Sequence, residues 1–139
     1  MKHFIAAVAF TTICSIFPSA AVGDDFDDVA VTVGKYFTGT EQGRPDLLEE
    51  AILPSLEVQL VAPEGKLRRI TSADFVNHFK PGKKMDRKGH IVSMDVSGNA
   101  ATVKVEIISG ERIYTDYLLL LKLDNVWRIS NKIVSLGQR

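Results

Sequence analysis

The 139-residue chain has one cysteine, Cys14, and its basic and acidic residues balance at 17 each. A single cysteine excludes an intramolecular disulfide. Because Cys14 lies in a segment that we expect to be removed, thiol catalysis and thiolate metal ligation are excluded from the mature domain as well. The balanced charge gives no support for general binding of nucleic acid or of a membrane surface, so we expect neither as a partner.

The N-terminal apolar run, residues 4–17, is too short to cross a bilayer, which takes a helix of about 20 residues. The run follows Lys2 and leads into small residues, which is the arrangement of a secretory signal peptide. We predict cleavage after Gly23. Residues 1–23 are then the signal peptide, and residues 24–139 form a single secreted domain with no membrane attachment.

The sequence also lacks a glycine-rich phosphate loop, a serine nucleophile elbow and a zinc-binding signature. Two histidines, His78 and His90, and the aspartate Asp116 fall on different predicted elements. They do not have the short i, i+4 spacing of helical metal ligands. We therefore predict no metal site and no cofactor.

Three helices are predicted before the last third of the chain. Apolar residues from Phe26 to Phe37 recur on one helical stripe, and Gly39 is the expected end of that helix. Pro45 suits the first position of a second, short helix. Thr71, with Asp74 three residues later, resembles a capping box that opens a third helix.

Strands are predicted from alternation of apolar and polar residues, separated by turn residues. They cover residues 56–62, 67–70, 90–96, 100–108, 112–123 and 126–134. Ser109-Gly110 and Asp124-Asn125 are short hairpin turns, since these residues tolerate positive φ. A long amphipathic helix packed on a curved antiparallel sheet is an α+β fold.

Two-residue hairpin loops would place Leu123 opposite Val126 and Ile108 opposite Glu111, which fixes the residues that share a face. The predicted core face comprises His90, Val92, Met94, Val96, Ala101, Val103, Val105, Ile107, Tyr114, Asp116, Leu118, Leu120, Trp127, Ile129, Asn131 and Ile133. The polar members of this face are the candidate site residues, because a buried polar group needs a partner or water.

Asp116 has two interpretations. As a general base in an apolar pocket it would abstract a proton next to a carbonyl, with Tyr114 or Asn131 donating to the developing oxyanion. As a structural residue it would be a buried carboxylate bonded to its neighbours. Both remain open.

Three further residues are candidates for ligand contact, and each could instead be a packing residue: Tyr36, His90 and Trp127. The run from Lys80 to Lys88 holds five basic residues and one acidic residue. It is either a solvated loop or an anion-binding or gating loop at the mouth of a pocket.

Three stretches carry a family resemblance: "YFTGTEQGRPDLLEEAI", "HIVSMDVSGNAATVKVE" and "YTDYLLLLKLDNVWRISNK". Through them the chain resembles the nuclear transport factor 2-like superfamily, most closely its secreted bacterial members labelled "putative lumazine-binding". The resemblance implies a cone-shaped sheet curled around the long helix with a pocket between them, and a periplasmic location. It also implies a homodimer through the outer sheet face, where Tyr117, Leu119 and Leu121 are expected.

This superfamily includes ketosteroid isomerase, scytalone dehydratase, epoxide hydrolases and polyketide cyclases, together with pocket proteins of no known activity. Nothing in the sequence points to a pterin site. The function we predict is binding of a small apolar or aromatic molecule in an apolar pocket. The alternatives are a small isomerase, dehydratase or cyclase that uses Asp116 as base, and a dimeric interaction module with a filled cone.

Overall fold

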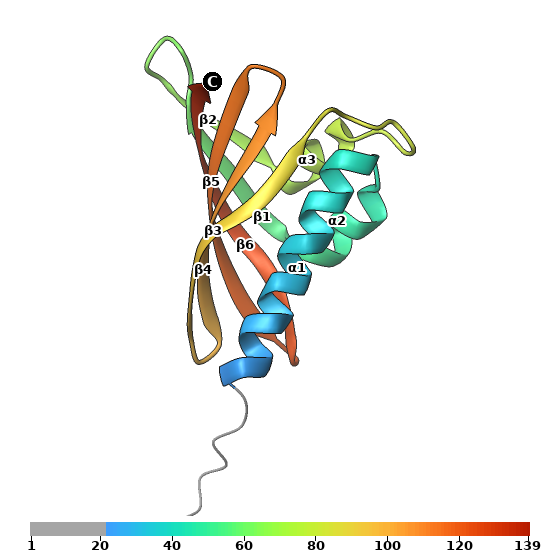
Figure 1. Cartoon of the computed structure of the whole chain (residues 1–139), viewed down its shortest axis with the longest axis vertical. Coiled ribbons are helices and arrows are strands. Elements are labelled where there is room, and N and C mark those ends of the chain that lie inside the picture. The colour runs from blue at the N-terminus through green and yellow to red at the C-terminus, as the bar shows by residue number, and fades with distance from the viewer. Residues whose placement is uncertain (1–21) are drawn as a thin grey trace, which may run out of the picture.

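The computed structural model describes residues 22–139, which form three helices and one six-stranded sheet (Figure 1). The elements in chain order are α1 (Val22–Gln42), α2 (Pro45–Ala51), β1 (Ile52–Val61), β2 (Leu67–Thr71), α3 (Ser72–His78), β3 (Lys88–Ser97), β4 (Ala100–Ser109), β5 (Arg112–Leu123) and β6 (Val126–Gln138). The predicted signal peptide lies outside the described residues except for Val22 and Gly23, which begin α1.

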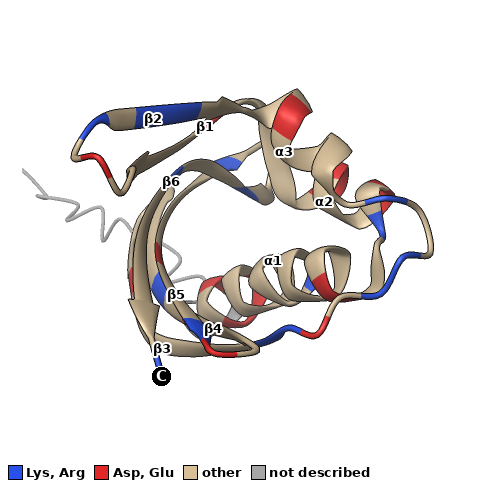
Figure 2. Ribbon diagram, turned by 90° about the horizontal axis from the view of Figure 1, so that it is seen from above, with Lys and Arg blue, Asp and Glu red and all other residues tan. Residues whose placement is uncertain are grey.

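The strand order in the sheet is β2-β1-β6-β5-β4-β3. β1 runs parallel to β6, and the other neighbouring pairs are antiparallel. Seen from above, the sheet curves around α1, while α2 and α3 lie on the far side of α1 from β4 (Figure 2). The predicted α+β cone is confirmed. In the described part of the chain no helix has the length and apolarity of a membrane span.

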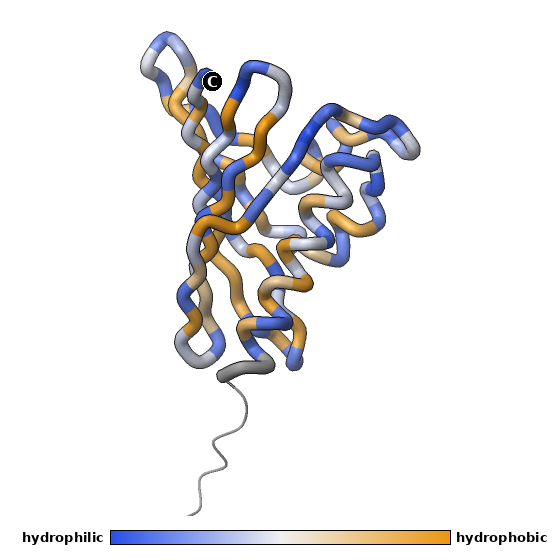
Figure 3. The backbone as a smooth tube through the Cα atoms, in the orientation of Figure 1, coloured by the Kyte–Doolittle hydropathy of each residue, from blue (hydrophilic) through white to orange (hydrophobic). Residues whose placement is uncertain are grey.

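One stripe of α1 packs on the concave face of the sheet, as the spacing predicts. Val29, Val33 and Tyr36 are each at most 1% exposed, and Figure 3 shows apolar residues along both α1 and the strands. The predicted helix end at Gly39 is wrong, because α1 continues to Gln42. A Cβ on Gly39 would lie 2.7 Å from the Leu48 side chain, so this glycine allows α2 to approach closely.

The β4–β5 hairpin is shifted by two residues from the predicted register. Ser109 pairs with Arg112, so the turn is Gly110-Glu111, and Val105 lies opposite Asp116. Because side chains alternate with a period of two, this shift leaves every residue on its predicted face. Asp116 is accordingly buried on the core face.

A bulge in β6 reverses the predicted faces of its second half. Leu120 pairs with Ile129 as predicted, but Leu119 then pairs with Asn131, so Ser130 is an extra residue. A single extra residue inverts the alternation that follows it. The prediction that Asn131 and Ile133 face the core is therefore wrong: both are exposed, and Lys132 is buried in their place.

A second irregularity has the same effect in β3. Ile91 pairs with Val105 and Ser93 with Lys104, which leaves Val92 as the extra residue. His90 therefore lies on the outer face beside Glu106, with 3.5 Å between His90 Nε2 and Glu106 Oε2. The prediction that His90 and Val92 face the core is wrong, since both are exposed.

Candidate functional site

Three buried polar side chains meet between α1 and the sheet. The Tyr36 hydroxyl donates to Asp116 Oδ2 at 2.7 Å, and Lys132 Nζ donates to the Tyr36 hydroxyl oxygen at 2.5 Å. Lys132 Nζ also lies 2.9 Å from Asp116 Oδ2. Tyr36 comes from the helical stripe, Asp116 from β5, and Lys132 from the bulged part of β6. We call these residues the buried triad.

Burial shapes the electrostatics of the buried triad. Desolvation lowers the pKa of the Lys132 ammonium, and the Asp116 carboxylate opposes that effect. Desolvation also raises the pKa of the Tyr36 phenol well above its usual range, and Asp116 adds to the rise. Tyr36 therefore remains a neutral hydrogen-bond donor near neutral pH. The Lys132 ammonium lies 4.7 Å from the centre of the Phe75 ring, a cation–π contact.

An open pocket of about 930 Å³ adjoins the buried triad at Lys132. Its wall is formed by the second half of β1, β2, α3, the start of β5 and the end of β6. Lys132 reaches this wall, and Tyr114 and Phe75 line it, whereas Asp116 does not. The pocket therefore meets the cationic end of the triad and not its carboxylate.

The pocket wall is rich in positive charge. Its charged residues are Arg68, Arg69, Arg87, Arg112 and Lys132, with Asp74 as the acidic member. β2, which supplies two of the arginines, stands out as a basic strand in Figure 2. An excess of one charge in a cleft raises the local concentration of ligands of opposite charge.

Arg87 is the buried arginine of this wall, at 8% exposed. Its guanidinium makes cation–π contacts with two aromatic rings, 5.5 Å from the centre of Phe79 and 5.4 Å from that of Tyr114. Its Nε has no hydrogen-bond partner within residues 22–139. Arg87 belongs to the basic run from Lys80 to Lys88, so one residue of that run faces the pocket while its other four basic residues are exposed.

The segment before Arg87 is docked on the end of α1. Met85 N donates to the Glu41 carbonyl at 2.8 Å, and Gly82 N donates to the Gly43 carbonyl at 2.9 Å. Gly43 has φ +64°, and a Cβ there would lie 2.4 Å from the Lys80 carbonyl oxygen. Only a glycine fits this contact without a shift of backbone. The docking fixes where Arg87 enters the pocket.

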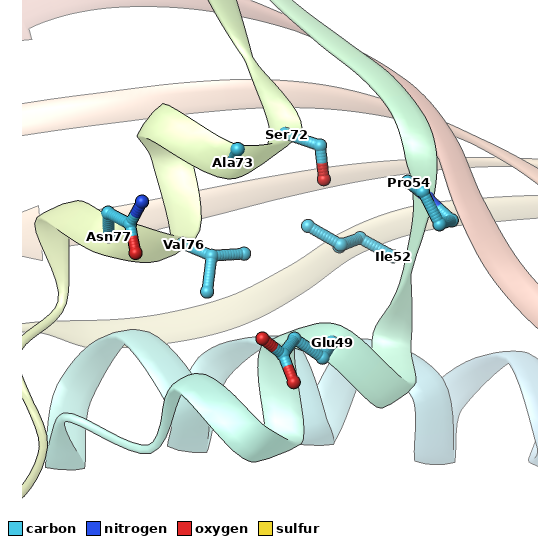
Figure 4. Close-up of a pocket in the computed structure, with 7 residues that line it drawn as sticks. All are labelled: Glu49, Ile52, Pro54, Ser72, Ala73, Val76 and Asn77. Atoms are coloured by element: carbon cyan, nitrogen blue, oxygen red, sulfur yellow. The ribbon is translucent and has the colours of Figure 1, made fainter.

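A second, smaller pocket of about 490 Å³ lies between α2, the start of β1 and α3 (Figure 4). Its lining residues are Glu49, Ile52, Pro54, Ser72, Ala73, Val76 and Asn77. None of the predicted site residues contributes to it. It has one charged side chain and no buried ionic group, so we do not regard it as the candidate site.

The structure separates the predicted site residues into four places. Tyr36 and Asp116 join the buried triad, Tyr114 lies on the pocket wall, and His90 and Asn131 lie on the outer face. Trp127 is buried away from the pocket, and its Nε1 donates to Asp25 Oδ1 at 3.2 Å.

Sequence reasoning missed Lys132 and did not single out Arg87. Arg87 could have been identified from its place in the basic run. Lys132 could have been identified because the predicted buried carboxylate of Asp116 needs a cationic partner.

A family model described as "Putative lumazine-binding" matches residues 24–135. The chain belongs to this family. The match covers most of the chain and agrees with the fold, so the predicted nuclear transport factor 2-like superfamily is confirmed. No curated protein matches the chain.

Solved structures of the same superfamily superpose well. A nuclear transport factor 2-like protein of unknown function from Silicibacter pomeroyi is 21% identical with a TM-score of 0.73, over 81% of this chain and 96% of its own. One from Methylobacillus flagellatus is 24% identical with a TM-score of 0.73, over 83% and 94%. A ketosteroid isomerase-like protein from Erwinia carotovora atroseptica is 10% identical with a TM-score of 0.65, over 84% and 99%. At these identities the likeness shows the fold alone.

Proposed function

We propose that the protein binds a small molecule in the pocket that adjoins the buried triad. The observation that carries this proposal is a large open pocket whose wall holds two buried cationic side chains, Lys132 and Arg87. Ligand sites are typically mostly apolar clefts of about 300–1,000 Å³ with a few fixed polar groups. The phenylalanines and Tyr114 supply the apolar part, and the cations supply orientation. The family description, which names a small-molecule ligand, supports the same reading.

Catalysis by Asp116 has weaker support. A general base must come within hydrogen-bond reach of the proton that it removes. Asp116 is 0% exposed, and its Oδ2 accepts from Tyr36 and pairs with Lys132. We therefore propose that Asp116 holds Lys132 in place. The enzymatic alternative, which the likeness to a ketosteroid isomerase-like protein suggests, is tested by Asp116→Asn: it predicts loss of catalysis in protein that circular dichroism shows to be folded.

Native mass spectrometry tests the binding proposal. Val134 lies half-buried on the pocket wall, so Val134→Trp should fill part of the pocket. Val92→Trp is the matched control, because Val92 is 45% exposed and does not line the pocket. We expect added mass that leaves on denaturation in the wild type and in Val92→Trp, but not in Val134→Trp. Bare masses for all three proteins, with no thermal shift from any organic probe, would refute the proposal.

We further propose that the protein is exported and forms a homodimer through the outer sheet face. Four large apolar side chains support the dimer, since each is at least 38% exposed: Tyr117, Leu119, Leu121 and Ile133. Sedimentation should show a dimer that Leu119→Lys converts to monomer. Export predicts periplasmic material whose first residue is Asp24.

A further inference from the structure

We propose that the pocket selects organic carboxylates, in which a carboxylate is attached to an apolar or aromatic body, and that the Arg87 guanidinium binds the carboxylate. This inference rests on the proposed function, because it names the ligand class of the same pocket.

The buried charge of Arg87 is the observation from which we infer that the ligand is an anion. A buried guanidinium normally has a carboxylate partner, because taking the charge out of water is costly. Within residues 22–139, Arg87 makes no ion pair and no side-chain hydrogen bond, although it is more than nine-tenths buried. The faces of Phe79 and Tyr114 offset part of the cost, but Nε is buried with no partner and the guanidinium has no side-chain acceptors among the described residues. A ligand oxyanion would supply them.

The other charged residues of the pocket wall do not supply Arg87 with an anionic partner. Lys132 is already paired with Asp116, and Arg69 lies 3.7 Å from Glu57 Oε1. Arg68 and Arg112 are exposed on the wall and have no ion pair with another described residue. The wall therefore carries an excess of positive charge that attracts an anion but leaves Arg87 as its buried contact point.

The geometry favours a carboxylate over a phosphate. A guanidinium presents a planar fork that matches the two oxygens of a carboxylate. The Phe79 and Tyr114 rings contact the Arg87 guanidinium, and Phe79 in turn packs on Phe75, so aromatic side chains adjoin this fork along the wall. A phosphate dianion would call for a second buried cation, and Lys132 is already neutralised by Asp116. The aromatic wall suits an apolar or aromatic body next to the carboxylate.

Calorimetric titration with paired probes tests the inference. The probes are 2-naphthoate and its neutral amide, 2-naphthamide, which differ in charge but hardly in shape. We expect the wild type to bind the acid about 10-fold to 100-fold more tightly than the amide, the usual worth of a charged hydrogen-bond pair. Arg87→Met should remove the preference, and Arg87→Lys should retain part of it. The control Arg128→Gln, on a residue outside the pocket, should leave both affinities unchanged.

The outcomes separate this inference from the proposed function. Equal binding of acid and amide to the wild type, or an undiminished preference in Arg87→Met, overturns the role of Arg87 but leaves small-molecule binding intact. Absence of binding by both probes, together with bare masses in the native spectra, overturns both proposals. Displacement of naphthoate by inorganic phosphate more readily than by acetate overturns the choice of carboxylate. If Arg87→Met does not fold, Arg87→Lys and the wild-type comparison decide.

Discussion

Removing the Lys132 ammonium should destabilise the fold strongly. Lys132→Met keeps a straight side chain beside the Phe75 ring but leaves the Asp116 carboxylate with the Tyr36 hydroxyl as its remaining described donor. Asp116 Oδ1 has no hydrogen-bond partner among residues 22–139 even in the wild type. Breaking a buried ion pair by removing one partner costs about 3–5 kcal/mol. This is a large part of the roughly 5–15 kcal/mol that stabilises a small domain.

The reasoning is checked by urea unfolding at neutral pH of Lys132→Met, Asp116→Leu and the double variant. We expect each single variant to lose about 3–5 kcal/mol. The double variant should lose only about 1–3 kcal/mol, because an apolar pair replaces the ion pair at little cost but the buried Tyr36 hydroxyl loses both of its described partners. Lys122→Met is the matched control. The pair of Lys122 with Asp25 is 2.6 Å long but partly exposed, so it should contribute far less. A loss below about 1 kcal/mol in Lys132→Met, or losses that simply add in the double variant, would refute the account of the triad.

Three further predictions concern single positions. The raised pKa of Tyr36 favours its neutral form in the folded state, so its contribution to stability is complete below about pH 10 and is lost at higher pH; Tyr36→Phe should show a smaller loss on alkaline titration followed by circular dichroism. Gly43→Ala should lower the free energy of unfolding by about 2 kcal/mol or more, and Gly98→Ala, at φ +59° in open space, by only about 1 kcal/mol; equal losses would show that the docked loop is not tightly packed. Asn131→Ala should leave probe binding unchanged, because Asn131 is on the outer face; weakened binding would contradict its placement.

Much of the fold could be predicted because it depends on periodic patterns. The helical stripe of α1 and the cap of α3, where Asp74 N donates to Thr71 Oγ1 at 3.2 Å, follow directly from residue types and spacing. Asp116 is buried as predicted, although the predicted register of the β4–β5 hairpin was wrong. The register error was two residues, and an even shift leaves each residue on the same face of the sheet. The face of the sheet on which a residue lies is thus easier to predict than its partner on the neighbouring strand.

The bulges could not be predicted from hydropathy, and β6 shows why. Strict alternation places Asn131 and Ile133 inward, while the bulged arrangement places Lys132 and Val134 inward. Each choice buries one polar and one apolar residue, so the apolar pattern does not distinguish them.

The charge of Asp116 does distinguish the two arrangements of β6. A buried carboxylate gains far more from an ammonium at 2.9 Å than from an amide, and the bulge at Ser130 is the local change that brings Lys132 inward. The same test applies to Arg87, which has no such partner among the described residues although it is buried. A buried charge that the chain satisfies explains the fold, and a buried charge that the chain leaves unsatisfied indicates where a ligand binds.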